Sequence, residues 1–84
     1  MLTPDSPARD IFAYNVYRFR KAQGLTQAGL AARAGYGRVK AERVSDLEQG
    51  SHAPTLTTVD RIARALGVTA AQMLTCPGRG TGDP

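Results

Sequence analysis

Cysteine and histidine are nearly absent from this sequence. The 84-residue chain has one cysteine, Cys76, and one histidine, His52. A single cysteine cannot form a disulfide within the chain, and these two residues are too few to hold a metal ion. We therefore expect no disulfide within the chain, no metal site and no cofactor.

Long apolar runs are also missing. No stretch approaches the roughly 18 apolar residues of a membrane-spanning helix. The opening segment, MLTPDSPARD, has neither the basic nor the apolar region of a signal peptide. We expect a cytoplasmic protein with no membrane partner. The few acidic residues are scattered and no nucleophile pairs with a base, so we do not expect an enzyme.

What the chain does have is enough apolar residues for one small core, and an excess of positive charge. Hydrophobic residues make up 42% of the chain, and the net charge is +4. This length suits one domain. Small basic domains often bind a polyanion, usually nucleic acid, but a merely soluble basic protein is the alternative that charge alone leaves open.

Residues typical of helix ends divide the chain into five short helices. A first helix is expected to begin at Ser6 and Pro7. Thr26, Thr55 and Thr69 are expected N-caps, the last in a capping box with Gln72. The third helix is expected from about Val39 to Gln49, and the first four helices are expected to end at Gly24, Gly35, Gly50 and Gly67.

These elements predict a compact all-α domain over residues 10–75. Residues 1–9 would form an N-terminal arm and the helix start, and 76–84 a disordered Gly/Pro-rich tail. Apolar spacings of three and four predict which side chains form the core. They are Phe12, Val16, Phe19, Leu30, Val44, Leu47, Leu56, Val59, Ile62 and Leu66, with Val39 an open candidate.

Three segments carry a family resemblance: RKAQGLTQAGLAARAG, VSDLEQGSHAPTLTTVDRIARALGV and MLT. Together they resemble the helix-turn-helix domain of the Cro/CI phage-repressor family, also called XRE-like. The resemblance implies a five-helix, lambda-repressor-like domain that binds operator DNA, commonly as a dimer. It also implies that Gln27 holds a DNA phosphate, and that Arg20 and Glu48 form a structural pair between the first and third helices.

The sequence departs from the family pattern in two places. Gly29 stands where an acidic residue is usual, and the stretch from Gly35 to Glu48 is about three residues longer than the usual unit. The segment GRVKAERVSDLEQG is similar to the corresponding segment of BldD-like actinobacterial regulators. This similarity suggests a variant of the family with a lengthened turn before the third helix. The added residues would bring Arg38 and Lys40 to the DNA groove, and the alternative is a bulge directed away from DNA.

The expected DNA-binding residues gather around the start of the third helix. Arg and Lys can donate to guanine or phosphate, Glu can accept from cytosine, and an alanine methyl can contact a thymine methyl. The complete expected set is Gln27, Arg38, Lys40, Ala41, Glu42, Arg43, Ser51 and His52. A solvated helix start of mixed charge is the alternative interpretation of this segment.

Sequence-specific binding of double-stranded DNA is the leading expected function, as a repressor of a palindromic operator at the bacterial nucleoid. One alternative is an antitoxin that neutralises a toxin partner and binds its own promoter. Another is a protein-interaction module on the same fold. We expect a weak homodimer through a C-terminal apolar group, and nothing in the sequence indicates a small-molecule effector. The group is Val68, Ala71, Met73 and Leu74.

Overall fold

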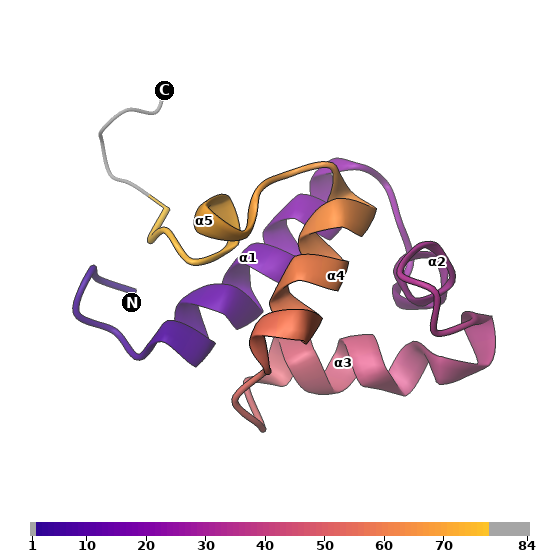
Figure 1. Cartoon of the computed structure of the whole chain (residues 1–84), viewed down its shortest axis with the longest axis horizontal. Helices are drawn as coiled ribbons and strands as arrows, with labels where there is room; N and C mark the ends of the chain where they lie inside the picture. Colours follow the sequence, from indigo (N-terminus) through magenta and orange to yellow (C-terminus); the bar gives the residue numbers. More distant parts are fainter. Residues whose placement is uncertain (1, 78–84) are drawn as a thin grey trace.

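Five α-helices and one short 3-10 turn make up residues 2–77, the part of the chain that the computed structural model describes. The all-α prediction is therefore confirmed. In order, the elements are α1 (Ala8–Ala22), α2 (Gln27–Arg33), the 3-10 turn η1 (Arg38–Lys40), α3 (Ala41–Gln49), α4 (Leu56–Leu66) and α5 (Ala70–Met73) (Figure 1). The expected tail lies mostly outside the described residues.

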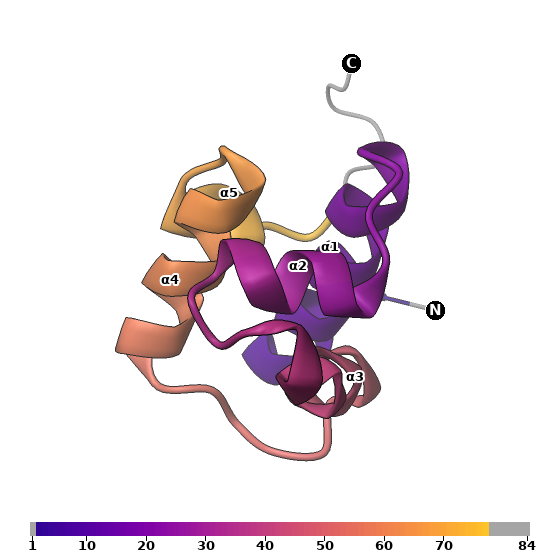
Figure 2. The ribbon, with the colours of Figure 1, turned by 90° about the vertical axis from the view of Figure 1, so that its right-hand side faces the viewer.

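The helices surround one core with α1 at its centre. Helix α1 contacts α3, α4 and α5, whereas α2 packs mainly against η1 and α3. Helices α2 and α3 cross at a steep angle: α2 is seen end-on in Figure 1, and α3 nearly so in Figure 2. This crossing leaves one side of α3 without a covering element.

Threonine caps begin three of the helices, as the sequence predicts. The Oγ1 atoms of Thr26 and Thr55 accept hydrogen bonds from backbone N–H groups three residues onward, at 2.9 and 3.1 Å. Thr69 and Gln72 form the expected capping box, with bonds of 2.8 and 3.0 Å. Each bond satisfies an N–H group that the helix itself leaves unpaired.

The expected Ser6 cap of α1 is wrong. Its hydroxyl accepts a hydrogen bond from the Thr3 N–H at 2.9 Å, closing a turn before the helix. Pro7 stands at the N-cap position, and no side chain caps α1. The Ser6 hydroxyl therefore accepts a hydrogen bond within a local turn instead of capping the helix. Serine side chains near helix starts often form such local hydrogen bonds in competition with the cap.

Most of the predicted core is buried, and Met73 joins it. Phe12, Val16, Leu30, Val44 and Ile62 are fully buried, and Val59 and Leu66 nearly so. Phe19 and Leu47 are half-buried and pack against this core. Met73 is fully buried as well, so its place in the expected dimer surface is wrong.

Two of the core candidates named from the sequence, Leu56 and Val39, lie outside the core. Leu56 is 81% exposed, so its predicted place in the core is wrong, and Val39 is 86% exposed. Leu56 is the first residue of α4, where no neighbouring element covers the side chain. Val39 lies in the 3-10 turn, whose three residues per turn do not continue the apolar face of α3.

Asn15 is a fully buried polar residue on α1. Its amide nitrogen lies 2.8 Å from the carbonyl of Met73, 3.0 Å from that of Thr75 and 3.3 Å from that of Gln72. These carbonyls belong to the last turn of α5 and the chain after it. Asn15 thus supplies the hydrogen bonds that α5 cannot make at its own C-terminal end.

Candidate nucleic-acid interface

Helix α3 buries one face and presents the other to solvent. Val44 is fully buried, and Leu47 is half-buried against the core. Glu42, Asp46 and Gln49 are exposed, at spacings of four and three that align them along one outward stripe. Arg43 is also exposed and lies on the flank of this stripe.

A buried ion pair fixes α3 against α1. The Arg20 Nε lies 2.5 Å from Glu48 Oε2, and both side chains are about nine-tenths buried. A second guanidinium nitrogen donates to Glu48 Oε1 at 3.1 Å, and Nη1 donates to the Leu25 carbonyl at 2.8 Å. The hydrogen bond with Glu48 raises the pKa of Arg20 above its ordinary value. A bidentate pair of this kind sets the orientation of two helices.

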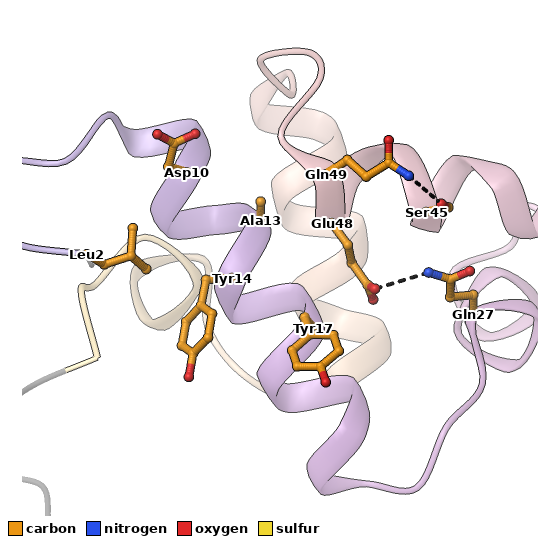
Figure 3. A pocket seen from close by; sticks show the side chains of 9 residues that line it. All are labelled: Leu2, Asp10, Ala13, Tyr14, Tyr17, Gln27, Ser45, Glu48 and Gln49. Atoms are coloured by element: carbon orange, nitrogen blue, oxygen red, sulfur yellow. Dashed lines mark hydrogen bonds between the residues drawn. The ribbon is translucent and has the colours of Figure 1, made fainter.

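Gln27, the first residue of α2, joins the same network. Its amide nitrogen donates to Glu48 Oε1 at 3.1 Å (Figure 3). An amide nitrogen carries two N–H groups. The hydrogen bond to Glu48 uses one of these N–H groups and leaves the other for a ligand. Gln27, which the family resemblance implies holds a phosphate, is thus itself held in place by α3.

An open groove of about 480 Å³ runs beside this network, between α1 and α3. Tyr14 and Tyr17 of α1 form one wall, and Ser45, Glu48 and Gln49 of α3 form the other (Figure 3). Gln49 donates to the Ser45 hydroxyl at 3.1 Å. The groove thus presents tyrosine, serine and amide groups together with the carboxylates of Asp10 and Glu48, next to the outward stripe of α3.

The lengthened stretch before α3 forms a turn and then the 3-10 helix η1. Gly35 and Gly37 have φ angles of 89° and 92°, a left-handed conformation that glycine adopts without steric cost. The regular α-helix begins at Ala41 rather than Val39, and η1 precedes it. The inserted residues therefore extend α3 at its N-terminal end, with Arg38 and Lys40 both exposed.

Tyr36, between the two glycines, lies against two arginines. The guanidinium carbon of Arg43 is 4.8 Å from the centre of its ring, and that of Arg61 is 5.1 Å away. Arg61 belongs to α4, which runs next to the loop after α2 (Figure 2). Arg43 was expected at the interface from the sequence, but Tyr36 and Arg61 were not, because no local pattern links residues 36 and 61.

The expected DNA-binding residues fall into separate groups. Arg38, Lys40, Ala41, Glu42 and Arg43 lie together on η1 and the first turn of α3, where Ala41 is half-buried. Ser51 and His52 are exposed in the loop after α3. They follow the C-terminal end of α3, whereas the first group lies at and before its N-terminal end.

Asp46 and Gln49 complete the outward stripe, and neither was among the residues expected from the sequence. A helical period counted from Glu42 would have found both, since they follow it by four and seven residues. Their position makes the centre of the stripe acidic and polar, while the cations lie at its N-terminal end and flank.

Positive charge at this end of α3 is unfavourable for the helix itself. A helix N-terminus carries partial positive charge, which favours an anion such as the first-turn Glu42 and disfavours the neighbouring cations. No carboxylate lies within ion-pair distance of Arg38, Lys40 or Arg43 in residues 2–77.

Membrane spans and metal clusters are both missing from the described chain. Between residues 2 and 77, no helix is long and apolar enough to cross a membrane. In the same range, no three His, Cys, Asp or Glu side chains come together as metal ligands.

Two crossed helices joined by a turn, with the second helix exposing a polar face, define a helix-turn-helix protein. Residues 16–72 match the HTH_3 helix-turn-helix family model. The chain belongs to this family, of Cro/CI (XRE) type, and is a helix-turn-helix transcriptional regulator.

Relatives and solved structures agree with this assignment. An uncharacterized HTH-type transcriptional regulator, y4dJ, of Sinorhizobium fredii is 36% identical over 67 residues, covering 80% of this chain and 83% of the relative. Another, from Methanothermobacter thermautotrophicus, is 48% identical over 48 residues, covering 57% and 65% of the two chains.

The crystal structure of the hypothetical transcription factor NHTF from Neisseria superposes with a TM-score of 0.79 at 34% identity. The match covers 92% of this chain and 85% of that one. An HTH_3 family transcriptional regulator from Vibrio cholerae gives a TM-score of 0.68 at 23% identity. It covers 79% of this chain and 35% of that one, and supports the fold alone.

Proposed function

We propose that the protein is a repressor that inserts α3 into the major groove of a palindromic operator at the nucleoid. The observation that carries this proposal is the exposed polar stripe of α3, held rigidly by the buried Arg20–Glu48 pair and by Val44. A recognition helix requires this division between a fixed inner face and a free outer face.

The residues at the start of α3 suit different parts of the DNA. Lys40 can donate to guanine O6 and N7, and Glu42 can accept from cytosine N4. Ala41 has only a methyl side chain, so it is limited to an apolar contact such as a thymine methyl. Arg38 lies about one turn before the first residue of α3, and its guanidinium suits a backbone phosphate.

Gln27 is proposed to hold a phosphate through its second amide N–H. Its first N–H is bonded to Glu48, so the direction of the second is fixed before DNA arrives. The N-terminus of α2 favours an anion at the same place. Ser51 and His52, at the opposite end of α3, would contact the backbone on the other side of the groove.

Two copies are proposed to share one operator. A single helix-turn-helix domain reads few base pairs, and pairing places two recognition helices about 34–36 Å apart. Because Met73 is buried, the apolar surface left near the C-terminus is small: Ala71 is exposed and Leu74 is 38% exposed. The homodimer is therefore expected to be weak and to form cooperatively on the full site. A single protein per palindrome in sedimentation would contradict this.

Selection of bound sequences from random duplexes tests the function, because a palindrome would report both specificity and two-fold pairing. With the selected operator, Lys40→Ala should weaken binding by about 1–3 kcal/mol if it reads a base, and by less on random DNA. Glu42→Gln should change sequence preference more than affinity. Arg64→Ala is the control, since this exposed arginine is paired with Asp60 at 2.8 Å. No enrichment of any sequence would refute the proposal.

An antitoxin that also binds its own promoter remains the alternative role, and would require a toxin partner. A toxin gene next to this gene, and a complex of the two proteins after co-expression, would distinguish it. A protein-interaction module without DNA is less compatible with the outward stripe, because a docking helix usually carries an apolar patch.

A further inference from the structure

The loop before α3 brings Arg43 and Arg61 to one aromatic ring. Their guanidinium carbons lie 4.8 and 5.1 Å from the centre of the Tyr36 ring. The two arginines come from different helices, α3 and α4. Both are exposed, whereas Tyr36 is half-buried and packs against the core. The ring therefore serves as a fixed support for two cations that a ligand can still reach.

Several contacts hold this arrangement in place. The left-handed conformations of Gly35 and Gly37 turn the chain on either side of Tyr36. Arg61 also donates to the Ala34 carbonyl at the end of α2, with a separation of 3.5 Å. Holding an arginine before binding reduces the side-chain entropy that the complex must lose, so an interaction made from this position is stronger.

Within residues 2–77, no acidic side chain neutralises the two guanidinium groups. In the described residues, neither Arg43 nor Arg61 has a carboxylate within 4.0 Å, whereas the neighbouring Arg64 is paired with Asp60. Two cations on one ring repel each other, and an anion between or beside them removes that repulsion. The planar fork of a guanidinium matches the oxygens of a phosphate.

We propose that Arg43 and Arg61, supported by Tyr36, bind the phosphate backbone of one DNA strand beside the recognition helix. This inference rests on the proposed DNA-binding function. The sequence left base and phosphate contacts open for Arg43, and this proposal assigns it to the backbone and adds α4 to the interface. Arg43 lies on the flank of the stripe formed by Glu42, Asp46 and Gln49, and the flanks of a helix in the major groove face the phosphates.

Arg61 and Tyr36 have different tasks in this site. Arg61 is the phosphate ligand, and its removal takes away a charge that releases counterions. Tyr36 is a positioning residue, since it has no charge and acts through the arginines. A variant of Tyr36 that keeps an aromatic ring should therefore bind DNA normally, whereas one that keeps only the bulk should not.

Binding of the full chain to the selected operator and to a random duplex, at several salt concentrations, tests the proposal. Arg61→Ala and Arg43→Ala should each weaken binding about tenfold, by the same factor on both duplexes. The slope of log K against log salt should fall in magnitude by about 0.9 for each phosphate that is no longer neutralised. Arg64→Ala removes a cation from the same helix, α4, but outside the cluster, and should leave affinity and slope nearly unchanged.

The Tyr36 variants separate positioning from charge. Tyr36→Leu should weaken binding on both duplexes with little change of slope, because both cations remain, and Tyr36→Phe should restore wild-type affinity. Thermal unfolding shows which variants fold. If Tyr36→Leu unfolds, the two exposed arginine variants still decide the proposal.

Four results would overturn the proposal in part or in full. If Arg61→Ala binds DNA as Arg64→Ala does, α4 is not part of the DNA interface. The arginines would then be expected to bind an acidic protein surface instead. Loss on the operator alone in Arg43→Ala would make that residue a base reader. Wild-type affinity in folded Tyr36→Leu would refute the positioning role. Failure of the wild-type protein to bind any duplex would refute the proposed function itself.

Discussion

Replacing Asn15 by alanine should destabilise the protein more than its single polar side chain suggests. The Asn15 amide faces three carbonyl oxygens at 2.8, 3.0 and 3.3 Å, but has only two N–H groups to give. We therefore count two hydrogen bonds, each with a net value of about 1 kcal/mol. The carbonyls left without a partner at the end of α5 add about 1–2 kcal/mol. The expected loss is about 3–4 kcal/mol.

Urea unfolding followed by far-UV circular dichroism measures this loss. The midpoint should fall while the slope m stays constant, which would indicate a change of stability rather than of compactness. Asn15→Asp is the sharper variant: it keeps the shape of the side chain and its contact with Arg18, but directs a carboxylate at three carbonyls. It should be at least as destabilising as Asn15→Ala.

Arg18→Ala is the matched control, because it removes the other partner of the Asn15 side chain. The Arg18 guanidinium donates to Asn15 Oδ1 at 3.1 and 3.3 Å, from a half-buried position. Its loss should change stability by no more than about 1 kcal/mol. Equal losses in Arg18→Ala and Asn15→Ala, or tolerance of Asn15→Asp, would refute the idea that this amide holds the end of α5.

Two further predictions separate core, surface and network. Met73→Ala should destabilise the monomer by about 2–5 kcal/mol because Met73 is fully buried, whereas Leu56→Ala should change stability by less than about 0.5 kcal/mol. Urea unfolding of the two variants measures both changes. Similar values for the two would contradict the difference in burial. Glu48→Ala should lower the free energy of unfolding by about 3–5 kcal/mol, because it leaves the Arg20 guanidinium buried without its partner. Thermal unfolding of Arg20→Ala, Glu48→Ala and the double variant should show that the two stability losses are strongly non-additive. Additive losses would mean that the pair is not coupled.

Helix ends were predictable because their causes are local. Thr26, Thr55 and Thr69 accept bonds from N–H groups three residues away, so the sequence contains both partners of each cap. The same holds for the glycines that end the helices. The prediction for Ser6 was wrong for an equally local reason. The Ser6 hydroxyl accepts a hydrogen bond from the N–H of Thr3, three residues before it, and this turn replaces the helix cap.

Burial was less predictable, since periodicity shows which residues share a face but not which element covers it. Leu56 lies three residues before Val59, on the spacing of the inner face of α4, yet it is 81% exposed. Met73, in a helix of only four residues, is fully buried because α5 packs against α1 and α4. The buried role of Asn15 depends on carbonyls 57 to 60 residues further along the chain. No local pattern carries such information.

The lengthened stretch before α3 combines both kinds of information. Its glycines and cations are visible in the sequence, and so is their position before α3, whereas their contact with DNA stays a prediction. The arginine that shares Tyr36 with Arg43 comes from α4, so only the folded chain brings it there. The Tyr36 ring packs against the core and supports two exposed cations. The added residues thus place positive charge where α3 itself is destabilised by it, which is understandable if an anion completes the site.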